Sequence, residues 1–143
     1  MISTSAPRDI VGTGQTSADL QISEADPYDF GTQAIGSSNL KTFTLTNNGA
    51  FEASAIAGVS FGTTEYDFFG GSFPGTGGSC LATTLAGAST CSFVVEYVPS
   101  ASALEPDTVT INYNNGVGPT STTRTVQGTG ETEATLTLSL IHI

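Results

Sequence analysis

The sequence predicts an all-β fold, a sandwich of about seven short antiparallel strands. Two observations lead to this prediction. Short runs of alternating apolar and polar residues recur along the chain with turn-forming residues between them, which is the pattern of half-buried strands. No window of the sequence shows a sustained helical periodicity of apolar residues. The length of 143 residues and the hydrophobic content of 38% suit one folded domain with an ordinary core.

The expected strands are recognised by apolar residues that alternate with polar ones. In chain order they are centred on Leu20 and Ile22, Phe43 and Leu45, Ile56 and Val59, Tyr66 with Phe68 and Phe69, Cys91–Val98, Val109 with Ile111 and Tyr113, and Thr123–Gln127. The fifth run has the clearest pattern, because Phe93, Val95 and Tyr97 share one face. Pro99 ends this run, since proline cannot donate a hydrogen bond to a neighbouring strand.

Turn signals separate these runs. The segments Asn47–Gly49 and Asn114–Gly116 each contain an Asn-Gly pair, which tolerates positive φ and favours tight turns. The glycine-rich segment Gly70–Gly78 predicts a long flexible loop.

One stretch of sequence occurs twice. Residues Thr4–Ser23 align with Thr120–Ser139 at an offset of 116 residues, and ten of the twenty positions are identical. Self-similarity at a fixed period is typical of tandem domains. We therefore expect four segments: residues 1–14 as the last strand of a preceding repeat, 15–130 as one whole domain, 131–137 as the start of a following repeat, and 138–143 as a terminal segment of another origin.

The last six residues, Leu138–Ile143, match the translation of a transposase adapter used in DNA sequencing. We interpret them as an adapter translation and exclude them from the fold. The alternative is an ordinary apolar strand that continues from Ala134. On the adapter interpretation, His142, the one histidine of the chain, is not a biological residue.

The charge of the chain excludes several partners. The net charge is −10, with 13 acidic residues against Arg8, Lys41 and Arg124. Such a chain has no basic face to neutralise phosphates, so we expect neither nucleic acid nor anionic lipid as a partner. No apolar run approaches the roughly 20 residues of a membrane span, and the first residues lack the features of a signal peptide. If the protein is exported, we expect its signal to lie upstream of this sequence.

The two cysteines, Cys80 and Cys91, are separated by ten residues, and this spacing favours one disulfide. In the chain-entropy model, closing a loop of this size stabilises the fold by about 3 kcal/mol. A disulfide implies an oxidising compartment. Two thiols without neighbouring cysteines or histidines cannot complete a four-ligand zinc site, and this spacing is not that of a redox CxxC motif.

Six spaced motifs carry a resemblance to a known family. In order, they are Phe30-Gly31, Ile35–Ser37, Leu45–Gly49, Cys80 with Leu85–Cys91, Val95–Pro99 and Gly128–Gly130. This succession resembles the ASH/Hydin-type immunoglobulin-like domain, whose bacterial form is called choice-of-anchor D. The resemblance covers about Ala18 to Gly130.

The resemblance implies an immunoglobulin-like, seven-stranded antiparallel β-sandwich. It also implies a repeated structural or adhesive module, a stalk or spacer, of an exported bacterial protein at the cell surface or outside the cell. The partners of such a module are the neighbouring repeats of the same chain. The family offers no catalytic residues and no cofactor, so we expect a protein that is not an enzyme.

Two other functions stay open. A module that binds glycans or a partner protein would use the Gly70–Gly78 loop and the aromatic residues Phe68, Phe69 and Phe73 as a platform. An aromatic-rich groove would favour this function, whereas a closed loop packed on the sandwich would favour the stalk. The eukaryotic relatives of the family serve cilia and centrosomes, and free thiols at Cys80 and Cys91 would favour such a cytoplasmic scaffold.

Candidate metal and catalytic residues are few. The acidic residues Asp19, Glu24, Asp26 and Asp29 could bind Ca²⁺ between units, but their spacing matches no EF-hand, and we favour solvated acids in an ordinary turn. A paired-carboxylate hydrolase would need Asp67, Glu96 and Glu105 to approach one another.

The glycine pairs Gly12/Gly14 and Gly128/Gly130 resemble dinucleotide loops only superficially. They lack the third glycine, the helix and the acidic residue that such loops need.

Overall fold

Nine strands and no helix make up the secondary structure of residues 2–139, the part of the chain that the computed structural model describes. The strands are β1 (Leu20–Ile22), β2 (Tyr28–Ala34), β3 (Asn39–Asn47), β4 (Ala53–Gly58), β5 (Tyr66–Phe68), β6 (Thr84–Leu85), β7 (Thr90–Tyr97), β8 (Leu104–Asn114) and β9 (Pro119–Glu131). Accordingly, this part of the chain has no helix that is long and apolar enough to cross a membrane. The prediction of an all-β fold is confirmed.

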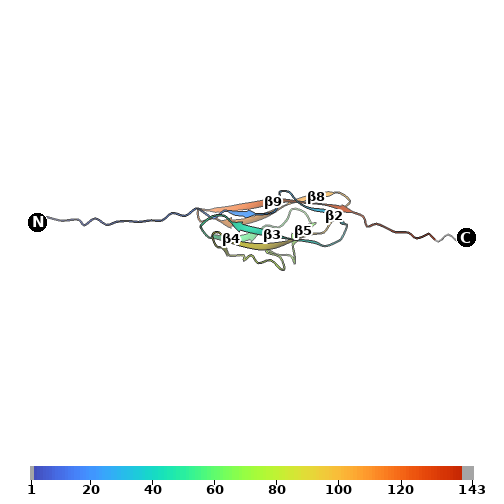
Figure 1. Cartoon of the computed structure of the whole chain (residues 1–143), viewed down its shortest axis with the longest axis horizontal. Helices are drawn as coiled ribbons and strands as arrows, with labels where there is room; N and C mark the ends of the chain where they lie inside the picture. The colour runs from blue at the N-terminus through green and yellow to red at the C-terminus, as the bar shows by residue number, and fades with distance from the viewer. Residues whose placement is uncertain (1, 140–143) are drawn as a thin grey trace.

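The strands form two sheets that pack face to face (Figure 1). The four-stranded sheet has the order β1-β3-β7-β5, and the five-stranded sheet has the order β2-β9-β8-β4-β6. The longest ladder joins β8 to β9 from Leu104↔Thr129 to Asn114↔Pro119. The sequence predicted antiparallel strands throughout. This prediction is wrong for one pair in the five-stranded sheet, because β2 and β9 run parallel.

Side chains from the inner faces of both sheets form the core. The largest fully buried side chains are Tyr97, Phe43, Phe93, Leu20, Ile22, Leu45, Ile56, Ile111, Val95, Val109, Val126 and Asn47. The predicted face of β7 is confirmed, because Phe93, Val95 and Tyr97 are all fully buried. The rings of Phe43 and Phe93 stack across the β3–β7 pair with centroids 5.3 Å apart.

Two strands of the structure, β2 and β6, were not among the seven predicted from the sequence. In β2, the residues Asp29–Thr32 contain an irregular register, and Gly31 has a φ of 74°, so the apolar alternation is interrupted. The strand β6 has two residues, too few for any periodicity. One predicted strand is also shorter than expected: β4 ends at Gly58, and Val59 is exposed.

Both predicted Asn-Gly turns are present. The side-chain Oδ1 of Asn47 accepts a hydrogen bond from the Gly49 amide at 3.0 Å, and Oδ1 of Asn114 accepts one from the Gly116 amide at 2.8 Å. Gly116 has a φ of 92°, a conformation that suits glycine. These turns close the β3–β4 and β8–β9 connections.

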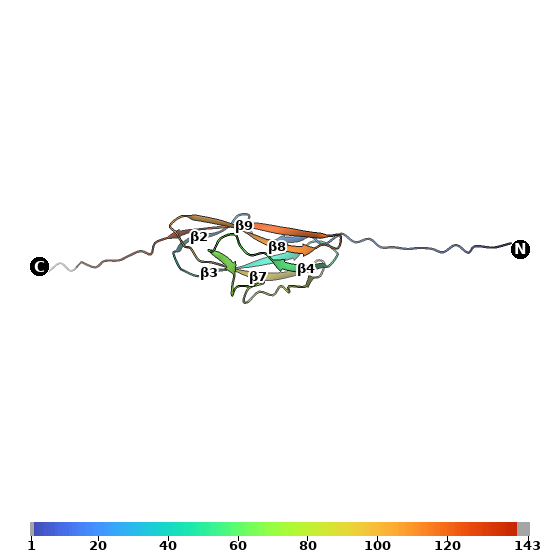
Figure 2. The ribbon, with the colours of Figure 1, turned by 180° about the vertical axis from the view of Figure 1, so that it is seen from behind.

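The two terminal segments leave the sandwich at opposite ends of its long axis (Figures 1 and 2). Residues 2–17 and 132–139 lie outside the strands and are exposed. Of the predicted adapter segment 138–143, residues 140–143, which include His142, lie outside the described residues. The expected boundaries at residues 14, 130 and 137 stay predictions.

Candidate functional site

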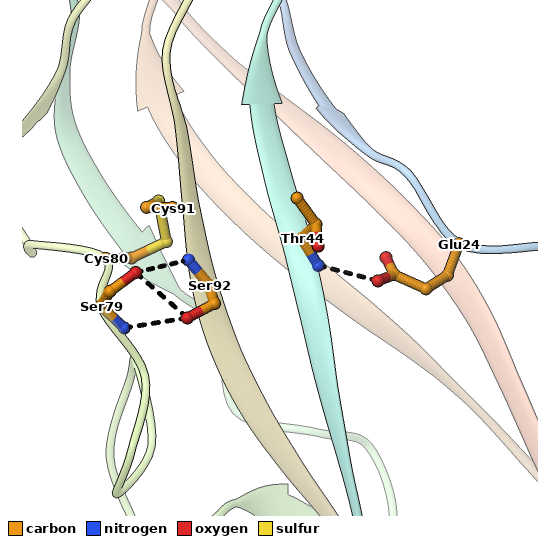
Figure 3. The surroundings of a disulfide bond; sticks show 6 residues. All are labelled: Glu24, Thr44, Ser79, Cys80, Cys91 and Ser92. Atoms are coloured by element: carbon orange, nitrogen blue, oxygen red, sulfur yellow. Dashed lines mark hydrogen bonds between the residues drawn. A yellow bond between two sulfur atoms is a disulfide. The ribbon is translucent and has the colours of Figure 1, made fainter.

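The structure contains the disulfide that the cysteine spacing predicts. Cys80 and Cys91 are bonded, with their Cα atoms 4.8 Å apart, and Cys80 is buried at the edge of the core (Figure 3). Cys91 lies in β7, opposite Leu45 of β3. The segment between the cysteines carries β6, which belongs to the other sheet. The disulfide therefore closes a segment that crosses from one sheet to the other and returns.

A pair of serines continues this connection. Ser79 and Ser92 directly adjoin the cysteines on each side (Figure 3). The Ser92 amide donates to Oγ of Ser79 at 2.9 Å, and the Ser79 amide donates to Oγ of Ser92 at 3.2 Å. The two hydroxyl oxygens are 3.1 Å apart. This reciprocal pairing aligns the backbone at Ser79 with β7 next to the disulfide.

The Gly70–Gly78 loop packs along the edge of β7, which is not the flexible loop that we expected. The Phe69 amide donates to the Val94 carbonyl at 2.9 Å, and the Val94 amide donates to the Pro74 carbonyl at 2.7 Å. Gly75 is required here, because a Cβ on it would lie 2.4 Å from the Val94 oxygen. The loop thus takes up the edge hydrogen bonds that β5 leaves free beyond Phe68.

Two of the three aromatic residues of this region, Phe68 and Phe73, pack toward the core. Phe68 is buried, and Phe73 packs edge-on against it with centroids 5.4 Å apart. Phe73 also contacts Phe93 of the core, at 6.0 Å between centroids. Phe69 is half-buried. This arrangement is the closed loop, and it offers no exposed aromatic platform at Phe68 or Phe73.

The acidic residues Asp26 and Asp29 lie beside β9. Oδ2 of Asp26 is 3.5 Å from Nη1 of Arg124, and its Oδ1 accepts a hydrogen bond from the Thr125 amide. Oδ2 of Asp29 accepts a hydrogen bond from the Gln127 amide group at 2.9 Å. This bond, together with one from the backbone of the β2 bulge, lowers the pKa of Asp29 from its ordinary value. Both carboxylates therefore fix the start of β2 against β9.

Asp19 and Glu24 are placed differently. Asp19 accepts a hydrogen bond from the Gln21 side chain at 3.0 Å. Oε1 of Glu24 accepts one from the Thr44 amide at 2.9 Å, so this carboxylate continues the pairing of β3 beyond the end of β1 (Figure 3). Across residues 2–139, no group of three or more His, Cys, Asp and Glu side chains is arranged to hold a metal ion.

Two of the three carboxylates considered for hydrolysis are neighbours. Asp67 and Glu96 lie directly opposite each other on β5 and β7. Asp67 bonds to the Phe68 amide, and Glu96 accepts a hydrogen bond from the hydroxyl of Ser38. Glu105 has other partners, because its carboxylate accepts hydrogen bonds from the Tyr97 hydroxyl and the Ser100 amide.

Glu105 organises what we call the C-terminal end of the sandwich, formed by residues 34–37, 98–105 and 128–131. Oε2 of Glu105 accepts a hydrogen bond from the Tyr97 hydroxyl at 2.8 Å. Its Oε1 accepts hydrogen bonds from the amides of Ser100 and Ala101 at 3.1 and 2.9 Å. Burial, and then the nearby Glu105 carboxylate, raise the pKa of Tyr97 above its ordinary value. A buried tyrosine with this partner stays neutral and holds the turn between β7 and β8 in place.

Asn47 organises the opposite, N-terminal end of the sandwich, formed by residues 16–19, 47–52, 86–90 and 114–118. It has 0% exposure and is the one fully buried polar residue of the described chain. Its Nδ2 donates to the carbonyls of Phe51 and Leu85 at 2.9 and 3.1 Å, and its Oδ1 accepts the amide of Asp19 at 3.1 Å. One side chain therefore satisfies three chain segments that meet at this end.

The sequence pattern alone predicts only a turn at Asn47. The alternation along β3 could have predicted that Asn47 is buried, because Phe43, Leu45 and Asn47 share one face and the first two belong to the core. A polar residue that falls on the inward face of a strand must find partners or destabilise the fold.

The N-terminal segment is attached to this end of the sandwich. The Phe51 amide donates to the Thr16 carbonyl at 3.0 Å, and the Ala50 amide donates to the Thr16 hydroxyl at the same distance. The Ala18 amide donates to the Asn115 carbonyl at 3.0 Å. The chain is therefore anchored from Thr16 onward, four residues before β1 begins.

A hollow of about 350 Å³ lies between this segment and the β8–β9 turn. Its lining residues are Thr13, Gln15, Ser17, Phe51, Asn115, Gly116 and Val117. The apolar side chains of Phe51 and Val117 are exposed here. The hollow thus combines polar segment residues on one side with apolar side chains on the other.

Comparisons with known proteins support the fold and leave the function open. The sequence matches no protein-family model and no curated protein. Among solved structures, the VesB protease of Vibrio cholerae is similar with a TM-score of 0.57 and 14% identity, over 79% of this chain and 32% of that one. The secreted serine protease VesC from the same organism is similar with a TM-score of 0.50 and 17% identity, over 76% of this chain and 23% of that one.

At such low identity these two likenesses concern the fold alone, and this chain spans less than a third of the length of the VesB chain and less of the VesC chain. The ASH / PapD-like domain 7 of human CEP192 matches over 95% of this chain and 99% of its own, with 11% identity and a TM-score of 0.47, which is too low to support an argument. The β-sandwich architecture predicted from the sequence is confirmed by the two packed sheets themselves.

Proposed function

We propose that this chain is a non-enzymatic repeat module of the ASH/Hydin type, in its bacterial choice-of-anchor D form, that acts as a stalk or spacer in an exported surface protein. One observation carries the proposal. The two copies of the repeated sequence have opposite surroundings: Val126 in β9 has 0% exposure, whereas its counterpart Ile10 has 96%. A segment with the pattern of a buried strand, but without a sheet to pair with, is expected at the junction of tandem domains.

Other observations support a mechanical role over a chemical one. The Gly70–Gly78 loop is closed over β7, and Phe68 and Phe73 pack toward the core, which favours a stalk over a glycan-binding surface. The carboxylates Asp67 and Glu96 lie together on a strand surface, and Glu105 supports a turn. We therefore assign no catalytic residue and no cofactor.

The disulfide supports an extracellular or cell-surface location. A bond between Cys80 and Cys91 forms and persists in oxidising compartments and favours this location over the cytoplasm of a ciliary scaffold. Mass spectrometry of the protein purified from its own host should find both cysteines oxidised. Alkylation of both thiols without prior reduction would contradict an exported module.

A strand exchange tests the repeat. Residues Arg8–Gln15 would replace Arg124–Glu131 within β9, which changes four of the eight positions and places Ile10 where Val126 lies. If the N-terminal segment is the last strand of a homologous unit, the exchanged protein folds cooperatively, with a loss of about 2 kcal/mol or less for the altered packing. The control carries the same eight residues in shuffled order and should not fold. An exchanged protein as unfolded as the control, by circular dichroism and urea denaturation, would overturn the proposal.

Calcium gives an independent test. A ligand that binds only the native state at a hundred times its dissociation constant would add about 2.7 kcal/mol. Because Asp19, Glu24, Asp26 and Asp29 bond to separate partners, we expect the same melting temperature in EDTA and in millimolar Ca²⁺. A rise of several degrees with Ca²⁺ would assign these residues to a metal site instead.

A further inference from the structure

We propose that the hollow at the N-terminal end of the sandwich is the seat for the C-terminal end of the preceding unit, and that the side chain at the Leu104 position of that unit enters it. This inference rests on the proposed tandem arrangement and adds the surface by which two units meet. The partner is a second unit of this kind in the same chain.

The offset of 116 residues fixes where the preceding unit ends. Glu131 is the last residue of β9, and its counterpart in the N-terminal segment is Gln15. The next residue, Thr16, is already bonded to Ala50 and Phe51 of the following unit. The tandem arrangement therefore leaves no free linker between the two sandwiches, and their ends must face each other.

The strand register identifies the side chain that reaches the hollow. Leu104, the first residue of β8, lies directly opposite Thr129 of β9. Residues that are directly opposite in a ladder project from the same face of the sheet. The counterpart of Thr129 is Thr13, which lines the hollow. In a tandem pair, the residue at the Leu104 position would therefore stand beside Thr13 at the opening of the hollow.

The exposure of both surfaces supports their pairing. Leu104 is 57% exposed, and Val117 on the far wall of the hollow is 88% exposed. Phe51, beside Val117, is also exposed, and its ring contacts the position of Gly116 so closely that a Cβ there would lie 2.5 Å from it. The ring is thus held in place with one side open. Apolar groups at the two ends would gain burial when the ends meet.

The test joins residues 1–131 of one copy to residues 16–143 of a second copy, which keeps the spacing of the repeat. Residue 131 of the first copy is followed directly by residue 16 of the second, so that Glu131 takes the place of its counterpart Gln15. Melting is followed by circular dichroism, and the shape is measured by small-angle X-ray scattering. Because the ends stabilise each other, the joined protein should melt about 3 °C or more above the single chain and scatter as a stiff rod.

Variants locate the effect. Leu104→Asp in the first copy, or Val117→Asp in the second, should remove the rise in melting temperature and give the scattering of two independent domains. In the single chain, the same changes should leave the melting temperature within about 1 °C, because both residues are exposed there. The matched control is Leu81→Asp in the first copy, since Leu81 is 65% exposed and lies beside the disulfide, outside the residues that form the C-terminal end.

The outcomes separate the two proposals. If both copies fold but melt and tumble independently, the surface is wrong and the repeat proposal stands. The same conclusion follows if Leu81→Asp removes the rise as fully as Leu104→Asp. If the second copy does not fold behind residue 131, the spacing is wrong, and both proposals are overturned.

Discussion

The two copies of one sequence motif in this molecule show what holds a strand in place. Residues 120–131 form most of β9, which pairs with β8 on one side and with β2 on the other. Residues 4–15 share the same glycines and the same arginine and lie outside both sheets. The corresponding pair at the other end of the repeat is Leu20, 2% exposed, and Leu136, 99% exposed.

This difference shows that alternation of apolar and polar residues lets a segment form a strand but does not by itself determine whether the strand forms. Alternating residues form a strand when a neighbouring strand can accept their hydrogen bonds and a core can bury their apolar face. In this sandwich only the second copy of the last strand and the first copy of the first strand have both. Substituting counterparts in pairs measures this difference directly.

The largest effect is expected for an aspartate at the two central apolar positions. Val126→Asp would place an unpaired charge in the core and should cost more than about 4 kcal/mol, enough to unfold the chain. Ile10→Asp, in the exposed copy, should change the free energy of unfolding by less than about 0.5 kcal/mol. Urea denaturation measures both. A comparable loss for Ile10→Asp would show that residues 4–15 pack on this unit.

The first strand offers a second pair. Leu20→Ala would leave a cavity between β1 and the core and should cost about 3 kcal/mol. Leu136→Ala shortens a side chain that is 99% exposed, and the unfolding midpoint of this variant should equal that of the unmodified protein. Equal losses in the two variants would mean that the C-terminal segment contributes to the core.

The glycine pairs Gly12/Gly14 and Gly128/Gly130, which have the same place in the two copies, provide a third comparison. A Cβ at Gly128 would lie 2.2 Å from the ring of Tyr97, which is buried and bonded to Glu105. Gly128→Ala should therefore cost about 2 kcal/mol through overpacking. At Gly12 nothing lies within 4 Å, so Gly12→Ala should be neutral. Tyr97→Phe in the Gly128→Ala background tests the cause: it should not restore the stability, because the ring itself is the obstacle.

The arginines are expected to differ least. Nη2 of Arg124 donates to the Ile22 carbonyl, and Nη1 lies 3.5 Å from Asp26. Arg124→Ala should cost about 1 kcal/mol, with part of the loss absent at high salt because the ion pair is screened. Arg8→Ala should have no measurable effect at either salt concentration. A salt-independent loss for Arg124→Ala would assign its contribution to packing and to the Ile22 bond alone.

Local sequence patterns predicted much of the fold. The strands around Phe93, Val95 and Tyr97 and around Val109, Ile111 and Tyr113 were predicted because alternation with a period of two is a local property. The two Asn-Gly turns were predicted for the same reason. The parallel pairing of β2 with β9 joins residues about a hundred positions apart, and no local pattern contains it.

The packing of the Gly70–Gly78 loop could not be predicted from its local sequence. Five glycines between residues 70 and 78 indicate freedom of the backbone, and the sequence alone predicts flexibility. In the structure, several of these glycines allow the loop to lie against Val94 and to bring Phe73 onto the core. Val94 is buried in consequence, although it lies on the outward face of β7. These glycines permit close contact between the loop and β7. A glycine-rich sequence alone does not distinguish such a packed loop from a mobile one, because the residues that it contacts lie elsewhere in the chain.

The positions of the termini determine how the molecule would respond to tension. A force pulling the two ends apart would act along the long axis, where Figure 1 places the terminal segments on opposite sides. It would enter through the hydrogen bonds of Thr16 and through β1, which is paired with β3 over three residues. It would leave through β9, whose ladder with β8 covers eleven residues and which also pairs with β2. Bonds in the long ladder would share the force, whereas the short pairing of β1 would give way first. The unit would thus extend slightly before the sandwich ruptures, and the segment enclosed by Cys80 and Cys91 would stay closed even afterwards.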